Sequence, residues 1–110
     1  MIGGLLIKPD GEVVQVSVAS LEDMQSLVGG YIELITLGDC DLYVNEDGIA
    51  MRLRPNSTAT MFAVARLKKD GRLLLTKNGK ILGNALFLGP CVEGEIADLP
   101  DAVVKEIQKE

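Results

Sequence analysis

Residues 12–37, with the sequence EVVQVSVASLEDMQSLVGGYIELITL, decide the fold because their hydrophobic period changes twice. Residues 12–18 place valines at alternate positions, which is typical of a strand with one buried face. Residues 20–28 place apolar side chains at helical spacing behind a serine that can cap the first turn. Two glycines then end the helix, and residues 31–37 return to a strand pattern. The stretch therefore predicts a strand, a helix and a strand in this order.

The segments on either side of this stretch predict more antiparallel strands. Residues 4–8 are predicted to form a strand. Pro9-Asp10-Gly11, a sequence typical of a tight turn, follows it, so this strand is expected to pair with residues 12–18 as a hairpin. Further strands are predicted over residues 42–44, 49–53, 72–76, 80–82 and 84–88. The last of these is closed by Gly89-Pro90. We predict an α+β fold, a mainly antiparallel sheet of hairpins with two or three packed helices, in a single domain over residues 1–110.

Two more helices follow the one in the opening stretch. The second covers residues 57–66 and begins after Asn56, whose side chain can cap it. Its predicted apolar side consists of Met61, Phe62, Val64 and Ala65. The last helix covers residues 100–109, and its inward side chains are predicted to be Val103, Val104 and Ile107.

The composition argues against several chemistries. The chain has 110 residues, no histidine and two cysteines, Cys40 and Cys91. The absence of histidine removes the commonest general base, the usual Ser and Cys triads and His-ligated zinc sites. Two thiols are too few for a structural zinc site, and we expect both to be buried and reduced. The acidic segment 45–48 does not fit the calcium loop, whose register would place Tyr43 and Arg54 at ligand positions. We therefore predict a protein that is not an enzyme and has no catalytic residues, no metal and no cofactor.

The net charge of −5 is unevenly spread along the chain. Residues 52–80 carry eight basic residues and one acidic residue, whereas the rest of the chain carries three basic and fifteen acidic residues. Because the basic band and the acidic body of two copies are complementary, we expect a homo-oligomer. Aromatic residues are not interleaved with the basic ones, so we expect no nucleic-acid partner. The chain has no signal-peptide pattern and no apolar stretch of about 20 residues, which predicts a cytoplasmic protein without membrane contact.

The junction between the strand at 49–53 and the second helix is one candidate binding site. Free amides at the start of a helix attract anions, and two arginines and three hydroxyls, Thr60 included, accompany them here. The predicted ligand residues are Arg52, Arg54, Asn56, Ser57 and Thr58, and the ligand would be a phosphate or a nucleotide. The alternative is a capped helix with both arginines pointing into water.

The end of the first helix is a second candidate site. Two glycines let the backbone approach a ligand closely, and Tyr31 and Glu33 follow them. Tyr31 could stack on a base, and Glu33 could bind a ribose hydroxyl or an amine. The alternative is a helix end that turns directly into a strand.

The middle of the chain resembles a known family. The segments LVGGYIE at residues 27–33 and LYVNEDG at residues 42–48 carry the resemblance, with Pro55-Asn56, Ala59-Thr60 and a glycine-flanked strand near residues 83–89. Together they resemble the domain-of-unknown-function family 3846, over roughly residues 4–98. The basic stretch at residues 66–80 departs from the pattern.

This resemblance implies an origin in phages or bacterial mobile elements, and it supplies no activity and no catalytic residues. We therefore expect a small non-enzymatic binding protein of a phage or mobile element in the bacterial host cytoplasm, acting on a host protein such as a defence component. The alternative is a module that holds a nucleotide or phosphate ligand at Arg52, Arg54 and Asn56.

Overall fold

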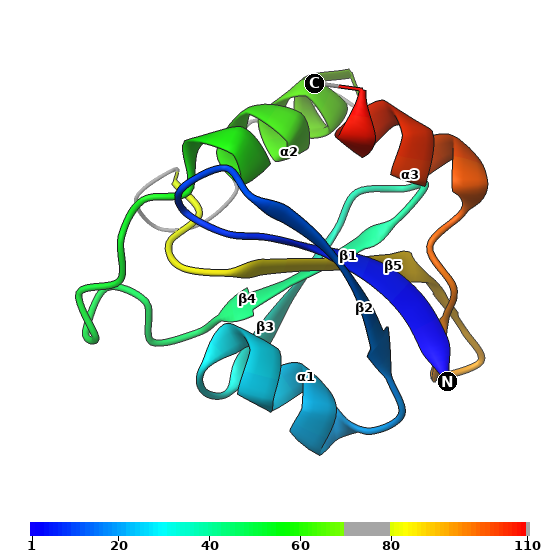
Figure 1. Ribbon diagram of the computed structural model, residues 1–110, viewed down its shortest axis with the longest axis horizontal. Coiled ribbons are helices and arrows are strands. Elements are labelled where there is room, and N and C mark those ends of the chain that lie inside the picture. Colours follow the sequence, from blue (N-terminus) through cyan, green and yellow to red (C-terminus); the bar gives the residue numbers. More distant parts are fainter. Residues whose placement is uncertain (70–79, 110) are drawn as a thin grey trace.

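The computed structural model describes residues 1–69 and 80–109, and shows a sheet with helices on both faces (Figure 1). The described strands are β1 (Ile2–Ile7), β2 (Val13–Val18), β3 (Ile32–Thr36), β4 (Asp41–Asn45), β5 (Ala85–Val92) and β6 (Glu95–Ala97). The described helices are α1 (Leu21–Val28), α2 (Ser57–Lys69) and α3 (Asp101–Gln108). Helices α2 and α3 cover one face of the sheet and α1 covers the other. The predicted α+β class is confirmed.

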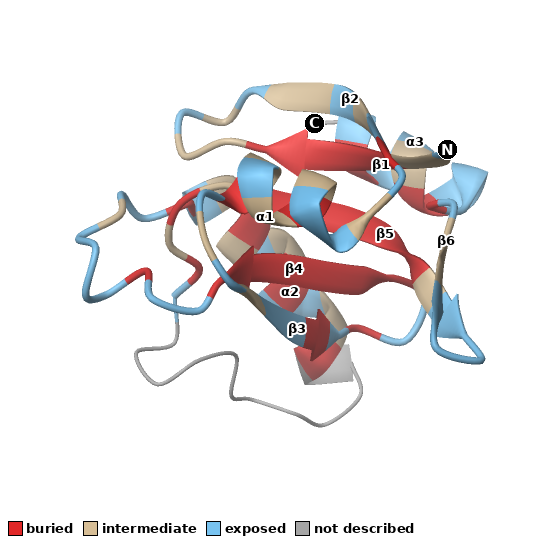
Figure 2. Ribbon diagram, turned by 90° about the horizontal axis from the view of Figure 1, so that it is seen from below, coloured by how far each residue is buried: buried red, intermediate tan, exposed pale blue. Residues whose placement is uncertain are grey.

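The strand order is β2-β1-β5-β4-β3, with β6 paired to β5, and the pairs are antiparallel. Two hairpins that are separate in sequence, β1–β2 and β3–β4, are therefore joined by β5, which lies between them. Leu5 of β1 and Leu42 of β4 both stand opposite Phe87 of β5. The middle strands are the most buried part of the sheet (Figure 2).

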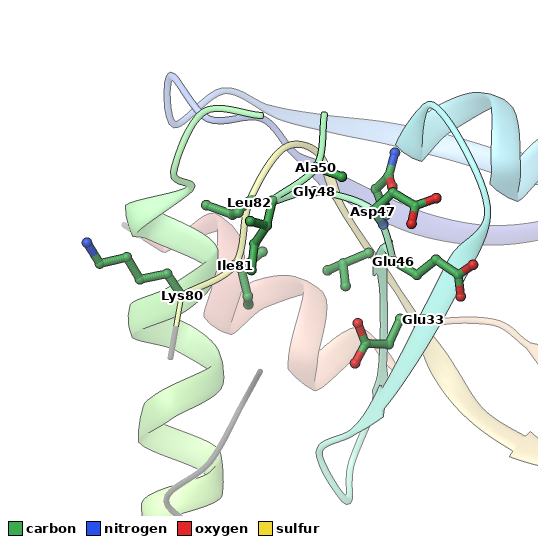
Figure 3. A pocket seen from close by; sticks show the side chains of 11 residues that line it. Glu33, Glu46, Asp47, Gly48, Ala50, Lys80, Ile81 and Leu82 are labelled. Carbon is green, nitrogen blue, oxygen red and sulfur yellow. Dashed lines mark hydrogen bonds between the residues drawn. The ribbon is translucent and has the colours of Figure 1, made fainter. Parts of the chain in front are cut away.

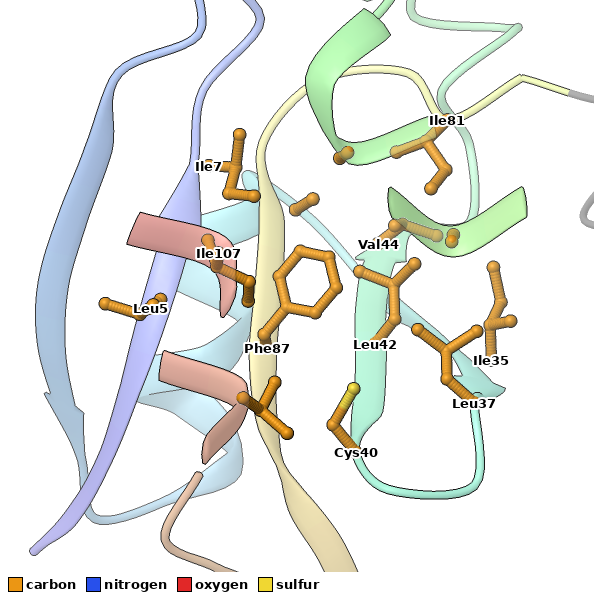
Figure 4. Packing of buried hydrophobic residues seen from close by; sticks show 14 of the residues in the cluster. Leu5, Ile7, Ile35, Leu37, Cys40, Leu42, Val44, Ile81, Phe87 and Ile107 are labelled. Atoms are coloured by element: carbon orange, nitrogen blue, oxygen red, sulfur yellow. The ribbon is translucent and has the colours of Figure 1, made fainter. Parts of the chain in front are cut away.

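The core under α2 and α3 is centred on Phe87, which is fully buried (Figure 4). Leu5 and Ile7 of β1 and Ile107 of α3 lie on one side of its ring. Leu42 of β4 lies on the other side. The ring also packs edge-on against Phe62 of α2, with 5.3 Å between the ring centres. Aliphatic side chains thus surround one aromatic ring, as the low aromatic content leads one to expect.

The core under α1 takes the opposite face of the same strands. Val14, Val16 and Val18 point toward it, whereas Val13 packs on the other side, as the alternation in β2 requires. Met24 and Val28 are the buried side chains of α1. The predicted alternation of strand and helix in the opening stretch is confirmed.

Local hydrogen bonds explain where α1 begins and ends. The Ser20 hydroxyl accepts from the amide of Asp23 (3.2 Å), and the Asp23 carboxylate accepts from the amide of Ala19 (2.7 Å). At the other end Gly29 takes the left-handed conformation (φ 82°) and its amide bonds to the carbonyl of Gln25. Both ends follow the predicted signals.

The prediction of a strand over residues 49–53 is wrong. The Asn45 side chain accepts from the amide of Asp47 (2.8 Å), which turns the chain away from β4. The amide of Leu53 then bonds back to the carbonyl of Gly48 (2.9 Å). These backbone groups are used in turns, so they cannot form a ladder with β4.

The predicted strand and hairpin around residues 72–80 are only partly within the described residues. Residues 72–76 lie outside them. Residues 80–82 form no strand of their own, and Leu82 makes a single bridge with Pro55.

The end of β5 also differs from the prediction. The strand does not close at Gly89-Pro90 but continues to Val92, with an irregular register between Gly89 and Val92, and then turns back into β6. The turn consists of Glu93 and Gly94, which both have positive φ (50° and 79°). Cys91 is exposed on this extension, so the prediction that both thiols are buried holds for Cys40 alone.

The buried face of α2 is not the predicted one. Its buried side chains are Ala59, Ala63 and Leu67, with Phe62 half-buried. Met61 is 73% exposed, and Val64 and Ala65 are exposed as well. The small alanines let the helix lie close to the sheet, and the helix is apolar on both sides, so composition alone could not select the inner side. α3 has Val103 and Ile107 buried, as predicted.

No helix within residues 1–69 and 80–109 is long and apolar enough to cross a membrane.

Candidate functional site

The residues predicted to bind a ligand do not line one cavity. Arg54 lines a cavity of about 330 Å³ beside the end of α1, together with Leu27 and Gly83. Glu33 lines a different cavity of about 360 Å³. Arg52 lies in an exposed turn with left-handed backbone (φ 56°) and lines neither of these two cavities.

Asn56 is fully buried and is bonded inside the protein. Its Oδ1 accepts from the amide of Ala59 (3.1 Å), so the predicted helix cap is confirmed. Its Nδ2 donates to the carbonyls of Ile7 (2.8 Å) and Gly83 (2.9 Å). The side chain therefore anchors α2 to β1 and to the segment just before β5, and the Ala59 amide that it caps is already satisfied.

The other predicted residues lie at the surface. Ser57 is exposed and Thr58 is half-buried in the first turn of α2. Tyr31 is 67% exposed just before β3, and its carbonyl accepts from the amide of Glu46 (3.0 Å). Of the two residues in the predicted glycine corner, Glu33 is the one that lines the 360 Å³ cavity.

We call this 360 Å³ space the Glu33 cavity (Figure 3). It lies between β3, β4, the turn after β4 and residues 80–82. Its apolar surface comes from Val44, Ile49, Ala50, Ile81 and Leu82, and its other lining residues are Glu33, Asn45, Glu46, Asp47, Gly48 and Lys80.

One wall of the Glu33 cavity is held in place by Asn45. This buried side chain donates to the carbonyl of Val28 (3.2 Å) and accepts from the amide of Asp47 (2.8 Å). The turn comes so close to the opposite wall that a Cβ on Gly48 would lie 3.1 Å from that of Leu82. A side chain at residue 48 would therefore press on Leu82 where the two walls meet.

The opposite wall, residues 80–82, is attached to the start of α2 by hydrogen bonds. The amide of Asn56 donates to the carbonyl of Ile81 (2.8 Å), and the amide of Ile81 donates to the Thr60 hydroxyl (3.0 Å). The amide of Gly83 donates to the carbonyl of Arg54 (2.7 Å). The wall is thus fixed through its own backbone groups, which leaves the side chains of Ile81 and Leu82 to form the apolar surface.

Of the charged side chains that the structure describes around the Glu33 cavity, one is turned into it. The Glu33 carboxylate points toward the side where Ile81 lies, whereas Glu46, Asp47 and Lys80 point away from it (Figure 3). Within residues 1–69 and 80–109, no hydrogen bond or ion pair occupies the Glu33 carboxylate. The arrangement is an apolar hollow with a single anionic group at its edge.

Sequence reasoning selected Glu33 but missed the apolar lining. Val44 was placed on a strand and Ile81 in a hairpin, and no local signal brings these segments together. Their meeting depends on two hydrogen bonds of Ile81, one with the backbone amide of Asn56 and one with the side-chain hydroxyl of Thr60.

A metal centre was not predicted, and in the part of the chain that the structure describes no three His, Cys, Asp or Glu residues are grouped to hold an ion.

The fold and the cavity define a small α+β protein. Its described residues form a six-stranded sheet with an open hollow at one corner. The chain matches the model of the family described as Domain of unknown function (DUF3846) over residues 2–110, and it belongs to that family. No curated protein and no solved structure matches it.

Proposed function

We propose that the protein is a small non-enzymatic binding protein and that the Glu33 cavity is its ligand site. The observation that carries the proposal is an open hollow of about 360 Å³ with apolar walls and one inward carboxylate. Ligand sites in proteins usually combine a hollow of about 300–1,000 Å³ with a few polar groups that orient the ligand.

The composition of the cavity favours binding over catalysis. Among the residues that the structure describes, its lining holds no serine, threonine, cysteine or histidine that could act as a nucleophile or as a neutral base. A pair of carboxylates could share acid and base roles, but such pairs face each other across the reacting bond. Glu46 and Asp47 instead point away from Glu33.

Binding can be tested by a fragment screen read by nuclear magnetic resonance on the labelled protein. We expect ligands that shift the signals of Val44, Ile81 and Leu82. Ala50→Trp places a large ring at the cavity and should abolish these shifts, because Ala50 lines it and is exposed. Ala102→Trp, at an exposed position of α3, is the matched control and should bind as the wild type does. A screen without binders, or binders unaffected by Ala50→Trp, would contradict the proposal.

We also propose that this binding serves a phage or mobile element against a host defence component. The support is the resemblance of residues 27–33 and 42–48 to the family pattern, which implies that origin. Bacteria that carry a defined defence system would be challenged with phage while expressing the protein. We expect expression to raise the plating efficiency and Ala50→Trp to cancel this effect. Unchanged plating across a panel of defence systems would contradict the idea.

A further inference from the structure

We propose that the ligand of the Glu33 cavity is an alkylammonium group, that is, an aliphatic stem that ends in a primary ammonium. This inference rests on the function proposed above and specifies its ligand class. The juxtaposition that carries it is one inward carboxylate beside the aliphatic side chains of Val44, Ile81 and Leu82.

The walls determine the kind of stem. The apolar side chains that the structure describes around the cavity are all aliphatic, so this part of its surface has no aromatic ring on which a base could stack. An engineered cavity of about 150 Å³ is large enough for benzene, so about 360 Å³ holds a stem of several methylenes with room for water. Contact with aliphatic walls favours such a stem at roughly 25 cal/mol per Å² of apolar surface removed from water.

The charges determine the end group. Three of the four ionisable residues that line the cavity are acidic, and the carboxylate turned inward is that of Glu33. An anionic ligand would be repelled by this carboxylate. A neutral ligand would leave it without a partner in the described structure. An ammonium satisfies it with a charge-assisted hydrogen bond, which is stronger than a neutral one.

Three probes of equal stem length separate these possibilities. They are n-pentylamine, 1-pentanol and pentanoate, titrated into the labelled full-length protein at pH 7, where the amine is protonated. We expect n-pentylamine to bind about fivefold more tightly than 1-pentanol, and pentanoate to bind most weakly. The advantage of the amine should shrink with added salt.

Two variants test the role of the carboxylate. Glu33→Gln removes the inward charge at an exposed position, so the fold should be unaffected. We expect it to weaken n-pentylamine about fivefold and to leave 1-pentanol unchanged. Glu46→Gln removes a lining charge that points away from the cavity, and it should change both affinities by less than about twofold.

The outcomes distinguish the ligand class from the function. If 1-pentanol binds as tightly as n-pentylamine and Ala50→Trp blocks both, the cavity binds ligands but the ammonium inference is overturned. The inference is also overturned if the amine does not bind while other fragments occupy the cavity. If no probe and no fragment binds, the proposed function falls as well.

The source of the ammonium can be a free amine or a lysine side chain of a partner protein. Nα-acetyl-lysine-N-methylamide carries the same stem with a peptide backbone attached. Binding equal to that of n-pentylamine would point to a lysine of a partner protein. Binding at least fivefold weaker would point to a free amine. Both results support an alkylammonium ligand.

Discussion

At the scale of single residues, the side chain of Asn56 connects distant parts of the fold. It caps α2 and also donates to two carbonyls from distant parts of the chain, those of Ile7 and Gly83. A cap alone could be supplied equally well by aspartate. The two donated bonds cannot be, because a carboxylate has no donor.

Replacing Asn56 should therefore separate the cap from the anchor. We expect Asn56→Ala to lower the free energy of unfolding by about 2–4 kcal/mol, since it loses the cap and leaves two buried carbonyls unsatisfied. Asn56→Asp keeps the cap but should be destabilising by a similar or larger amount. Ser57→Ala, at the exposed neighbouring position, should change stability by less than about 0.5 kcal/mol. Urea unfolding measures all three, and a stable Asn56→Asp variant would show that the cap alone matters.

The two cysteines differ in environment. Cys91 is exposed, and its sulfur lies 3.3 Å from the Tyr43 hydroxyl. Cys40 is buried, and burial, with the neighbouring Asp39 carboxylate, raises its pKa from 9.0 to about 12. The folded state thus disfavours the thiolate of Cys40, and the unfolded state does not.

This raised pKa makes stability depend on pH above 9. The stabilisation that the folded state gains from keeping Cys40 protonated is fully present below pH 9. It is lost as the pH rises toward 12, because in that interval the thiol ionises only in the unfolded state. We expect the stability advantage of the wild type over Cys40→Ala to shrink between pH 9 and 10.5, by up to about 1.4 kcal/mol per pH unit. Tyr43, whose pKa is raised by burial and by Cys91, is present in both proteins and cancels in the comparison. If the stability advantage of the wild type stays constant over this range, the pKa of Cys40 is not raised in the folded state.

At the scale of elements, Arg66 ties three of them together. Its guanidinium bonds to Asp39 in the β3–β4 turn at 3.0 Å through two nitrogens, and to Glu106 of α3 at 2.5 and 3.2 Å. It also lies 3.8 Å from the ring centre of Phe62. Burial favours the neutral form, but the hydrogen bonds to Glu106 and Asp39 outweigh it and raise the pKa of Arg66. Arg66 therefore stays charged and holds α2, α3 and the turn in one arrangement.

Removing this guanidinium should loosen the packing of α2 on α3. We expect Arg66→Ala to lower the free energy of unfolding by about 1–2 kcal/mol. The two ion pairs contribute only part of this, because both carboxylates are half exposed to water, and the lost contact with the Phe62 ring contributes the rest. Arg66→Lys keeps the charge but not the fork, and should recover about half of the loss. Lys105→Ala removes an exposed charge of α3 and serves as the control. Equal stability of Arg66→Ala and the wild type would show that the network contributes nothing.

How far the sequence predicts the elements depends on where their signals lie. Turns and caps are local, so Gly11, Ser20 and Gly29 could be assigned from their neighbours alone. The inner side of α2 is not local, because it depends on the anchor that Asn56 makes with β1. The site residues named from the sequence do not line one cavity. The residues around Glu33 gather through contacts between distant segments, which no local signal predicts.

At the scale of the whole molecule, self-association remains a prediction. The basic residues between 52 and 80 and the acidic remainder of the chain favour contact between copies. The outward side of α2 adds an apolar strip at Met61 and Val64, which a second copy could cover. We expect light scattering to give the mass of a dimer or larger assembly at low salt, with dissociation as salt is added. Met61→Asp should favour the monomer, and a monomer mass for the wild type at every salt concentration would rule the prediction out.

The position of β5 has a consequence for how the protein is made. The ribosome releases the β1–β2 and β3–β4 hairpins first. Strand β5, which joins them in the sheet, is absent until residues 85–92 emerge. Until then β1 and β4 each expose an unpaired edge and the apolar side chains that later surround Phe87. Pairings that wait for distant residues form slowly, and exposed edges attract other chains. Newly made copies are therefore most open to aggregation in the interval between the synthesis of β4 and that of β5.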